Sequence, residues 1–155
     1  MVEQVRAWLE EIADPEIPAL SIVDLGIVRE ARWQGDELEV TITPTYSGCP
    51  AMDAIRSDIE AALRAHGVRA VRLRTQLAPA WTTDWISARG REKLRGFGIA
   101  PPAAPALSAI APAVACPHCG SHATECVSAF GATGCKALYR CRACREPFDY
   151  FKPLA

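Results

Sequence analysis

Seven cysteines are the residues of this sequence with the greatest potential for chemistry, and six of them lie in its last quarter. Four of the six form two CxxC pairs, Cys116 with Cys119 and Cys141 with Cys144, with 21 residues between the pairs. Each pair can offer two thiolates to one metal ion, and zinc prefers four ligands at the corners of a tetrahedron. The spacing therefore predicts a structural zinc site of the zinc-ribbon type, closed to substrate because protein ligands take all four positions.

The segments around the pairs are patterned as the strands of a small ribbon. Residues Thr124–Phe130 and Cys135–Arg140 can form a hairpin, and Pro147–Phe151 can add a third strand. Gly120 suits the turn after the first pair, whereas Arg145 stands at the equivalent place after the second. A module of this size buries little apolar surface, so metal binding is expected to supply folding free energy outright.

Cys126 and Cys135 remain outside the two pairs, as do His118 and His122. One interpretation is that these four are core and surface residues of the hairpin. The alternative is that Cys126 and Cys135 are secondary thiols of an iron or iron–sulfur site, because thiolates bind both. The sequence leaves the two interpretations open.

Cys49 is the one cysteine of the N-terminal half, and it lies where a strand-like run gives way to a helix. The stretch Thr41–Leu63 breaks at Pro44, and Pro50 suits the first turn of a helix because proline lacks the N–H that would be unpaired there. Free backbone N–H groups and the positive end of the helix dipole converge at such a position, which favours the thiolate that binds metal or attacks electrophiles. A small cysteine buried beneath the turn is the alternative.

The elements that must position this cysteine alternate between helical and strand-like patterns. The order helix, strand, strand, helix, strand predicts a hairpin followed by a right-handed crossover to a parallel neighbour of the second strand. This arrangement is a small α/β sandwich with a mixed sheet. Its expected elements are a helix ending near Ala13, strands Ile27–Trp33 and Leu38–Ile42, a helix Pro50–His66 and a strand Val68–Leu77.

A further helical stretch and a spacer connect this module to the ribbon. The helix is expected to end near Arg95 with Thr82 or Thr83 as its cap, and the neighbouring Trp81 and Trp85 are expected in the core. Residues 100–115 are almost entirely alanine and proline and carry no charge, which favours an extended, semi-rigid spacer. The predicted organisation is an α/β domain at 1–98, an Ala/Pro-rich linker at 99–114 and a zinc ribbon at 115–155.

Charge and composition argue against several classes of function. Residues 1–98 carry 12 Lys and Arg against 15 Asp and Glu, and residues 99–155 carry 5 against 3. Neither part is polybasic, so a nucleic-acid partner is not expected. An acidic N-terminal segment and the lack of a long apolar run predict a cytoplasmic protein without a membrane span, in which cysteines serve metal or thiol chemistry rather than disulfides.

A thiol enzyme that uses Cys49 as its nucleophile needs a base in contact with the thiol. His66 is the only histidine of the N-terminal module and follows Cys49 by 17 residues. A continuous helix rises ~1.5 Å per residue, so the two side chains are expected to lie roughly 25 Å apart. This separation argues against a Cys–His dyad.

Several segments together resemble a known family. The segments that resemble the iron–sulfur assembly domain of the SufT type are the runs Asp14–Pro18 and Ile22–Ile27 and the turn Thr43–Pro50 with its Cys-Pro. Together with three further segments, these are similar to the PaaD (also called PaaJ) family of phenylacetyl-CoA epoxidase subunits. The further segments are the block Trp81–Ile86, the run Gly98–Pro102, and Phe130-Gly131 with Cys135-Lys136-Ala137 in the ribbon. The resemblance covers essentially the whole chain and departs at Ala132-Thr133-Gly134, where Ser-Thr-Ala is expected.

The resemblance implies a role in aerobic phenylacetate breakdown, in which a multicomponent di-iron oxygenase epoxidises the ring of phenylacetyl-CoA. It implies a chain that is not itself catalytic and that helps to mature or assemble a metal centre, with the other subunits, the reductase among them, as partners; a homodimer is left open. By the same analogy Cys49 would be a transient ligand of iron or of an iron–sulfur cluster, with Asp14, Glu16 and Asp24 as neighbours. The alternative is a purely structural subunit.

Overall fold

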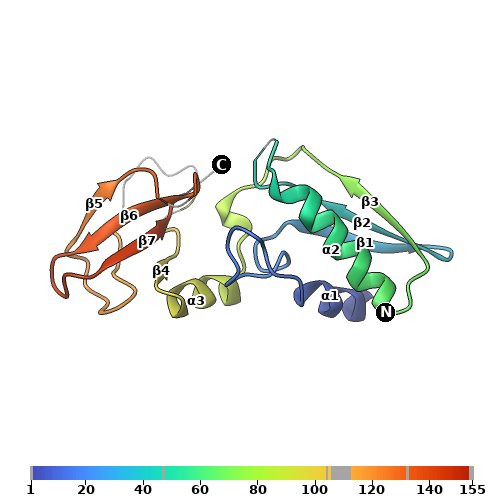
Figure 1. Cartoon of the computed structure of the whole chain (residues 1–155), viewed down its shortest axis with the longest axis horizontal. Helices are drawn as coiled ribbons and strands as arrows, with labels where there is room; N and C mark the ends of the chain where they lie inside the picture. Colours follow the sequence, from blue (N-terminus) through green and yellow to red (C-terminus); the bar gives the residue numbers. More distant parts are fainter. Residues whose placement is uncertain (1, 47, 104, 106–112, 132, 154–155) are drawn as a thin grey trace. The chain divides into compact units, whose positions relative to one another are not determined.

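The computed structural model describes residues 2–46, 48–103, 105, 113–131 and 133–153. The chain divides into two compact units, Met1–Trp81 and Thr82–Ala155 (Figure 1). Each unit has its own sheet and its own buried apolar residues. Within the described residues, no helix is long and apolar enough to cross a membrane.

A three-stranded mixed sheet forms the centre of the first unit. Strands β1 (Val28–Gln34) and β2 (Glu37–Ile42) pair antiparallel, and β3 (Ala70–Thr75) lies parallel to β2. The helices α1 (Val2–Glu10) and α2 (Ala51–Ala65) complete the unit, and Figure 1 shows α2 running along the sheet. The predicted α/β sandwich, its hairpin and its parallel crossover are confirmed.

Side chains from one face of β2 and one face of α2 pack together in the core of this unit. Leu38 and Val40 alternate along β2 and have no exposed surface, and the same holds for Ile59 and Leu63 on α2. Spacings of two residues on a strand and four on a helix place side chains on one face. Packing of these faces fixes the position of α2, and with it the turn that precedes the helix.

Residues 13–27, between α1 and β1, are also packed into this core. Leu20 and Ile22 have no exposed surface, and Leu25 is fully buried as well. The indole Nε1 of Trp81, a residue that is 3% exposed, donates a 2.8 Å hydrogen bond to the carbonyl of Leu25. The expected core position of Trp81 is confirmed.

The structure divides the chain earlier than the expected boundary at residue 98. Residues 82–98 lie in the second unit, where they form the short 3-10 helix η1 (Thr83–Trp85) and the helix α3 (Ala88–Gly96). The guanidinium of Arg91 on α3 donates to the carbonyl oxygens of Thr83 at 3.0 Å and Pro102 at 3.1 Å. These two bonds tie α3 to the chain that leads into the ribbon, and no local sequence pattern signals them.

Ser87 caps α3, and neither Thr82 nor Thr83 does. The Ser87 hydroxyl accepts a hydrogen bond from the N–H of Gly90 at 2.9 Å. Thr82 instead caps η1, by accepting from the N–H of Asp84 at 3.1 Å. Extended backbone at Ile86 (φ −64°, ψ 127°) separates the two helices, which is why the main helix begins later than expected.

The first residues of the expected linker belong to the sheet of the second unit. Ile99 and Ala100 form β4, which pairs parallel to β7 (Pro147–Phe151). Ala100 is buried in the core of the unit. The structure therefore differs from the expected spacer at these two residues, because β7 offers them a strand edge. Residues 104 and 106–112 of the expected linker lie outside the described residues.

A four-stranded sheet with the order β4-β7-β6-β5 forms the second unit. Strand β5 (Thr124–Ser128) pairs antiparallel with β6 (Lys136–Cys141), and β6 pairs antiparallel with β7. The predicted hairpin and third strand of the ribbon are confirmed. Phe148 and Tyr150 of β7 pack in a small apolar cluster that includes two of the CxxC cysteines.

Candidate metal sites

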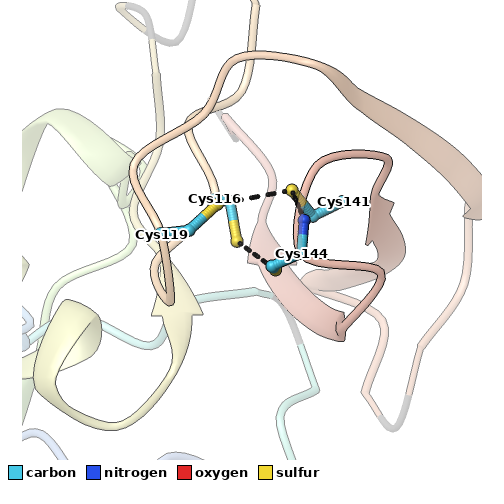
Figure 2. A group of neighbouring side chains, drawn as sticks. All are labelled: Cys116, Cys119, Cys141 and Cys144. Atoms are coloured by element: carbon cyan, nitrogen blue, oxygen red, sulfur yellow. Dashed lines mark hydrogen bonds between the residues drawn. The ribbon is translucent and has the colours of Figure 1, made fainter.

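The four cysteines of the two CxxC pairs come together in the second unit. Their sulfur atoms all lie within 4.8 Å of one another. Figure 2 shows the pairs facing each other, with Sγ–Sγ distances of 3.8 Å between Cys116 and Cys144 and 3.6 Å between Cys119 and Cys141. A tetrahedron of zinc–sulfur bonds of ~2.3 Å has edges of about 3.8 Å. The four sulfurs therefore fit one tetrahedral zinc ion.

Backbone N–H groups of each CxxC turn point at the sulfur of its first cysteine. The N–H of His118 donates to Sγ of Cys116 at 3.4 Å, and that of Cys144 donates to Sγ of Cys141 at 3.5 Å. Hydrogen bonds to sulfur favour the thiolate, and the bond from Cys144 is the main reason that the pKa of Cys141 is lowered to about 6. The second turn thus favours a charged sulfur at Cys141.

The site formed by these cysteines is closed. Protein side chains fill all four positions, so no position remains for a substrate, and the chemistry of such a site is structural. Cys116 and Cys141 are buried, and Cys144 packs at the edge of the apolar cluster. A zinc ion held there would join residues 116–119 to residues 141–144 and thereby close the ribbon.

The other two ribbon cysteines lie outside this cluster. Cys126 is exposed on β5, opposite Tyr139 of β6, and Cys135 is half-buried with its sulfur 2.9 Å from the hydroxyl of Thr133. Across the part of the chain that the structure describes, no second group of three or more His, Cys, Asp or Glu side chains is arranged to hold a metal. A secondary iron site at Cys126 and Cys135 thus gains no geometric support.

Cys49 lies at the start of α2, directly before the N-cap residue Pro50. Its N–H donates to the carbonyl of Tyr46 at 3.2 Å, which closes a turn in which Gly48 takes the positive φ of 75° that glycine tolerates best. The Cys49 side chain is half-buried. The residue is therefore not fully buried beneath the turn.

Tyr46, the first residue of the turn that ends at Cys49, reaches an acidic residue of the loop after α1. Its hydroxyl donates a 3.2 Å hydrogen bond to Oε1 of Glu16. Desolvation, the Cys49 thiol and the Glu16 carboxylate together raise the pKa of Tyr46 to about 12, so the phenol keeps its proton at neutral pH. We call Glu16, Tyr46 and Cys49 the Cys49 cluster.

The other two acidic residues predicted beside the lone cysteine are buried in the loop between α1 and β1. Asp14 accepts hydrogen bonds from the N–H groups of Glu16 and Ile17, both at 2.9 Å. Asp24 and Ser21 cap each other, with the N–H of Asp24 donating to the Ser21 hydroxyl at 3.0 Å and the N–H of Ser21 donating to Oδ2 of Asp24 at 3.3 Å. Both carboxylates thus hold the loop that carries Glu16.

Sequence reasoning missed two polar residues of this region, Tyr46 and Thr43. Thr43 follows β2 and is 1% exposed, and its hydroxyl has no hydrogen-bond partner among the described residues. No sequence signal marks that hydroxyl. For Tyr46 the available signal was its place three residues before Cys49, since the first and last residues of a tight turn lie close together.

His66 ends α2 at the opposite end from Cys49. Its ring stacks on Trp8 with 4.5 Å between the ring centroids, and its Nε2 lies 3.8 Å from a carboxylate oxygen of Glu11. The continuous helix keeps the imidazole away from the thiol, as expected. A thiol enzyme built on Cys49 therefore lacks a histidine base in this unit.

Comparisons with known proteins match both units. The family described as iron–sulfur cluster assembly protein matches residues 2–72, and the PaaD zinc beta ribbon domain matches residues 100–152. The chain is 50% identical over 152 residues to a putative 1,2-phenylacetyl-CoA epoxidase subunit of Escherichia coli (strain K12), a match that covers 97% of this chain and 92% of that protein.

Two further similarities concern a shorter part of the chain. An Fe-S protein maturation auxiliary factor of Porphyromonas gingivalis is 32% identical over 87 residues, which are 55% of this chain and 82% of that protein. The crystal structure of a domain of unknown function, DUF59, from Bacillus anthracis superposes with a TM-score of 0.56 at 27% identity, over 60% of this chain and 90% of that one.

Proposed function

Because the chain belongs to the PaaD family of phenylacetyl-CoA epoxidase subunits, we propose that it is an accessory subunit that helps to assemble or mature an iron-containing centre of such an epoxidase. The match of residues 2–72 to iron–sulfur assembly proteins supports this role. The centre is the iron–sulfur cluster of the reductase or the di-iron site of the oxygenase, and these subunits are the partners. The pathway served is phenylacetate breakdown.

The Cys49 cluster is the observation that carries this proposal. A hydrogen bond joins the Glu16 carboxylate to the Tyr46 phenol, and a backbone turn joins Tyr46 to the half-buried Cys49. Thiolate and carboxylate ligands bind ferrous iron, and a set this small leaves coordination positions open. An open set of ligands suits a metal that is received and then passed to another protein, in contrast to the closed four-cysteine site.

Each residue of the predicted site then has a role. Cys49 binds iron or an iron–sulfur cluster as a thiolate, and its proton passes to solvent. Glu16 adds a carboxylate oxygen, while Asp14 and Asp24 hold the loop on which Glu16 lies. The zinc ribbon serves as the module that docks on partner subunits.

Anaerobic reconstitution of the zinc-loaded full chain with ferrous iron and sulfide tests this proposal. The variant Cys49→Ser is compared with the wild type and with Cys126→Ser, which removes an exposed thiol of the ribbon as a matched control. Iron and sulfide per chain are measured, together with the recovery of epoxidase activity when each protein is added to subunits prepared from cells that lack this one. We expect Cys49→Ser alone to lose both iron and the recovery of activity.

If Cys49→Ser binds as much iron as the wild type and restores as much epoxidase activity, the proposed role of Cys49 is overturned. If the chain were then still required for epoxidase activity, it would act as a non-catalytic scaffold of the complex. That second function predicts that recovery follows binding of the chain to the other subunits and not its iron content.

A further inference from the structure

Strand β3 forms one edge of the sheet in the first unit (Figure 1). It pairs with β2 on one side, and within the described residues no strand pairs with its other side. The N–H of Gln76, directly after β3, donates to the carbonyl of Ile42 at 2.8 Å. Because alternate residues of a strand direct their backbone groups to opposite sides, the N–H and C=O groups of Val71, Leu73 and Thr75 point to the open edge.

The side chains of β3 alternate between a core face and an open face. Val71 and Leu73 are half-buried and lie in register with the buried core residues of β2. Arg72 and Arg74 alternate with them, so they lie on the opposite face of the sheet, where both are exposed. Arg69, which precedes the strand, is exposed as well. Three cations therefore line the start and the open face of this edge.

These three arginines lack an anionic partner. Within the part of the chain that the structure describes, no hydrogen bond or ion pair involves the guanidinium of Arg69, Arg72 or Arg74. Glu39 of β2 is the register partner of Arg72, but Oε1 of its carboxylate accepts two hydrogen bonds from Arg32 of β1, at 2.8 and 3.1 Å. The positive charge on β3 is thus left for a group from outside the sheet.

The edge is basic within a unit that is acidic. Residues 1–81 carry 8 Lys and Arg against 13 Asp and Glu, yet no acidic residue lies between Glu60 and Asp84. Like charges that face each other across two strands destabilise the pairing, so this edge disfavours a second copy of itself. The same charges attract carboxylates. The edge is therefore complementary to an acidic strand.

We propose that the open edge of β3 binds an acidic segment of a partner protein, which adds an extended strand to the sheet. The backbone groups of Val71, Leu73 and Thr75 pair with the main chain of that segment, and carboxylates at its alternate positions meet Arg72 and Arg74. The backbone pairing supplies affinity, and the arginines select for acidic side chains. This surface lies outside the Cys49 cluster and does not depend on iron binding there.

The test is an amide NMR titration of the isotope-labelled full chain with zinc in its ribbon. The probe is a short synthetic peptide in which Glu and Val alternate, and its control has Gln in place of Glu. A double variant, Arg72→Gln with Arg74→Gln, is compared with Arg6→Gln with Arg64→Gln, which removes two exposed cations from α1 and α2. Oligothymidylate is titrated as a polyanion of a different kind, and urea midpoints are measured for every variant.

We expect the Glu peptide to shift the amides of Val71, Leu73 and Thr75 and to protect them from hydrogen exchange. It should bind roughly three- to tenfold more tightly than the Gln peptide, and this preference should shrink at high salt. The double variant at Arg72 and Arg74 should unfold at the wild-type urea concentration and lose the preference. The matched variant on α1 and α2 should keep it.

Equal binding of the two peptides, or a preference that survives in the double variant on β3, would overturn the proposal. Peptide-induced shifts confined to residues outside β3 would overturn it as well. Shifts of the β3 amides that depend on protein concentration without peptide would assign the edge to a second copy of the chain instead. Tighter binding of oligothymidylate than of the Glu peptide would assign it to a nucleic acid. None of these results bears on the role proposed for Cys49.

Discussion

Arg145 occupies, in the second metal-binding turn, the left-handed backbone position that Gly120 occupies in the first. Their φ angles are 63° and 78°, and Arg145 is the one non-glycine residue with positive φ among the described residues. A residue with a Cβ is disfavoured in this conformation by roughly 1–2 kcal/mol. The two turns therefore reach similar geometry with different residues, and the second carries backbone strain that the first does not.

Replacing this arginine by glycine should stabilise the ribbon. We expect Arg145→Gly to raise the free energy of unfolding of the zinc-loaded chain by about 0.5–1 kcal/mol, because relief of the strain exceeds the added freedom of glycine in the unfolded chain. Urea unfolding measures the change. Arg145→Ala is the matched control, since it removes the same side chain but keeps the Cβ; an equal gain in Arg145→Ala would show that the guanidinium, and not the backbone, is responsible.

Loss of one zinc ligand should unfold the ribbon. We expect one zinc per chain in the wild type and none in Cys141→Ala, whose ribbon loses its near-ultraviolet circular dichroism because the metal supplies the folding free energy. Removal of zinc from the wild type by a chelator should have the same effect. Cys126→Ala serves as the control and should keep its zinc, because Cys126 lies outside the four-sulfur cluster; zinc retained by Cys141→Ala would contradict the site.

Asp14 should make the stability of the first unit depend on pH. Burial raises the pKa of its carboxyl above 3.8, even though two backbone N–H groups donate to it. The folded chain then binds this proton more tightly than the unfolded chain does. The contribution of this carboxyl to the free energy of unfolding therefore falls as the pH rises from 3.8 through the folded-state pKa, and it is constant at higher pH.

The variant Asp14→Asn should remove this pH dependence, because an amide oxygen can accept the same two hydrogen bonds without a charge. We expect it to be at least as stable as the wild type at pH 7. Asp14→Ala should lose about 1–3 kcal/mol, because the buried N–H groups of Glu16 and Ile17 lose their acceptor. Urea unfolding at pH 4 and pH 7 separates the three proteins, and a pH dependence that persists in Asp14→Asn would assign it to another group.

Thr43→Val should not destabilise the first unit. The buried Thr43 hydroxyl has no partner among the described residues, so its replacement by a methyl group of similar size should leave the free energy of unfolding unchanged or raise it by about 1 kcal/mol. Thr124→Val is the contrast, because the Thr124 hydroxyl donates to the carbonyl of Val114 at 2.7 Å and its loss should cost stability. A clear loss of stability in Thr43→Val would reveal a partner for that hydroxyl.

Local sequence patterns predict most of the helices and strands of this protein and its cluster of four cysteines. The spacing of Cys116, Cys119, Cys141 and Cys144 is a local pattern, and the two-residue and four-residue periods of β2 and α2 are local as well. Such patterns can be read from the sequence alone, because the backbone geometry of a single turn, strand or helix fixes the spacing of its side chains. The same reasoning placed Cys49 at the start of α2.

Contacts between residues far apart in the sequence are visible in the folded chain and not in any local pattern. Three such contacts join segments that no local pattern relates. Ile99 and Ala100 pair with β7, and the Arg91 guanidinium donates hydrogen bonds to the carbonyls of Thr83 and Pro102. The third is the hydrogen bond from Tyr46 to Glu16. Asp14 and Asp24 are likewise buried and hydrogen-bonded within their own loop, whereas Glu16 accepts a hydrogen bond from the Tyr46 hydroxyl. Such choices depend on packing and on the satisfaction of buried polar groups in three dimensions, which a sequence pattern does not encode.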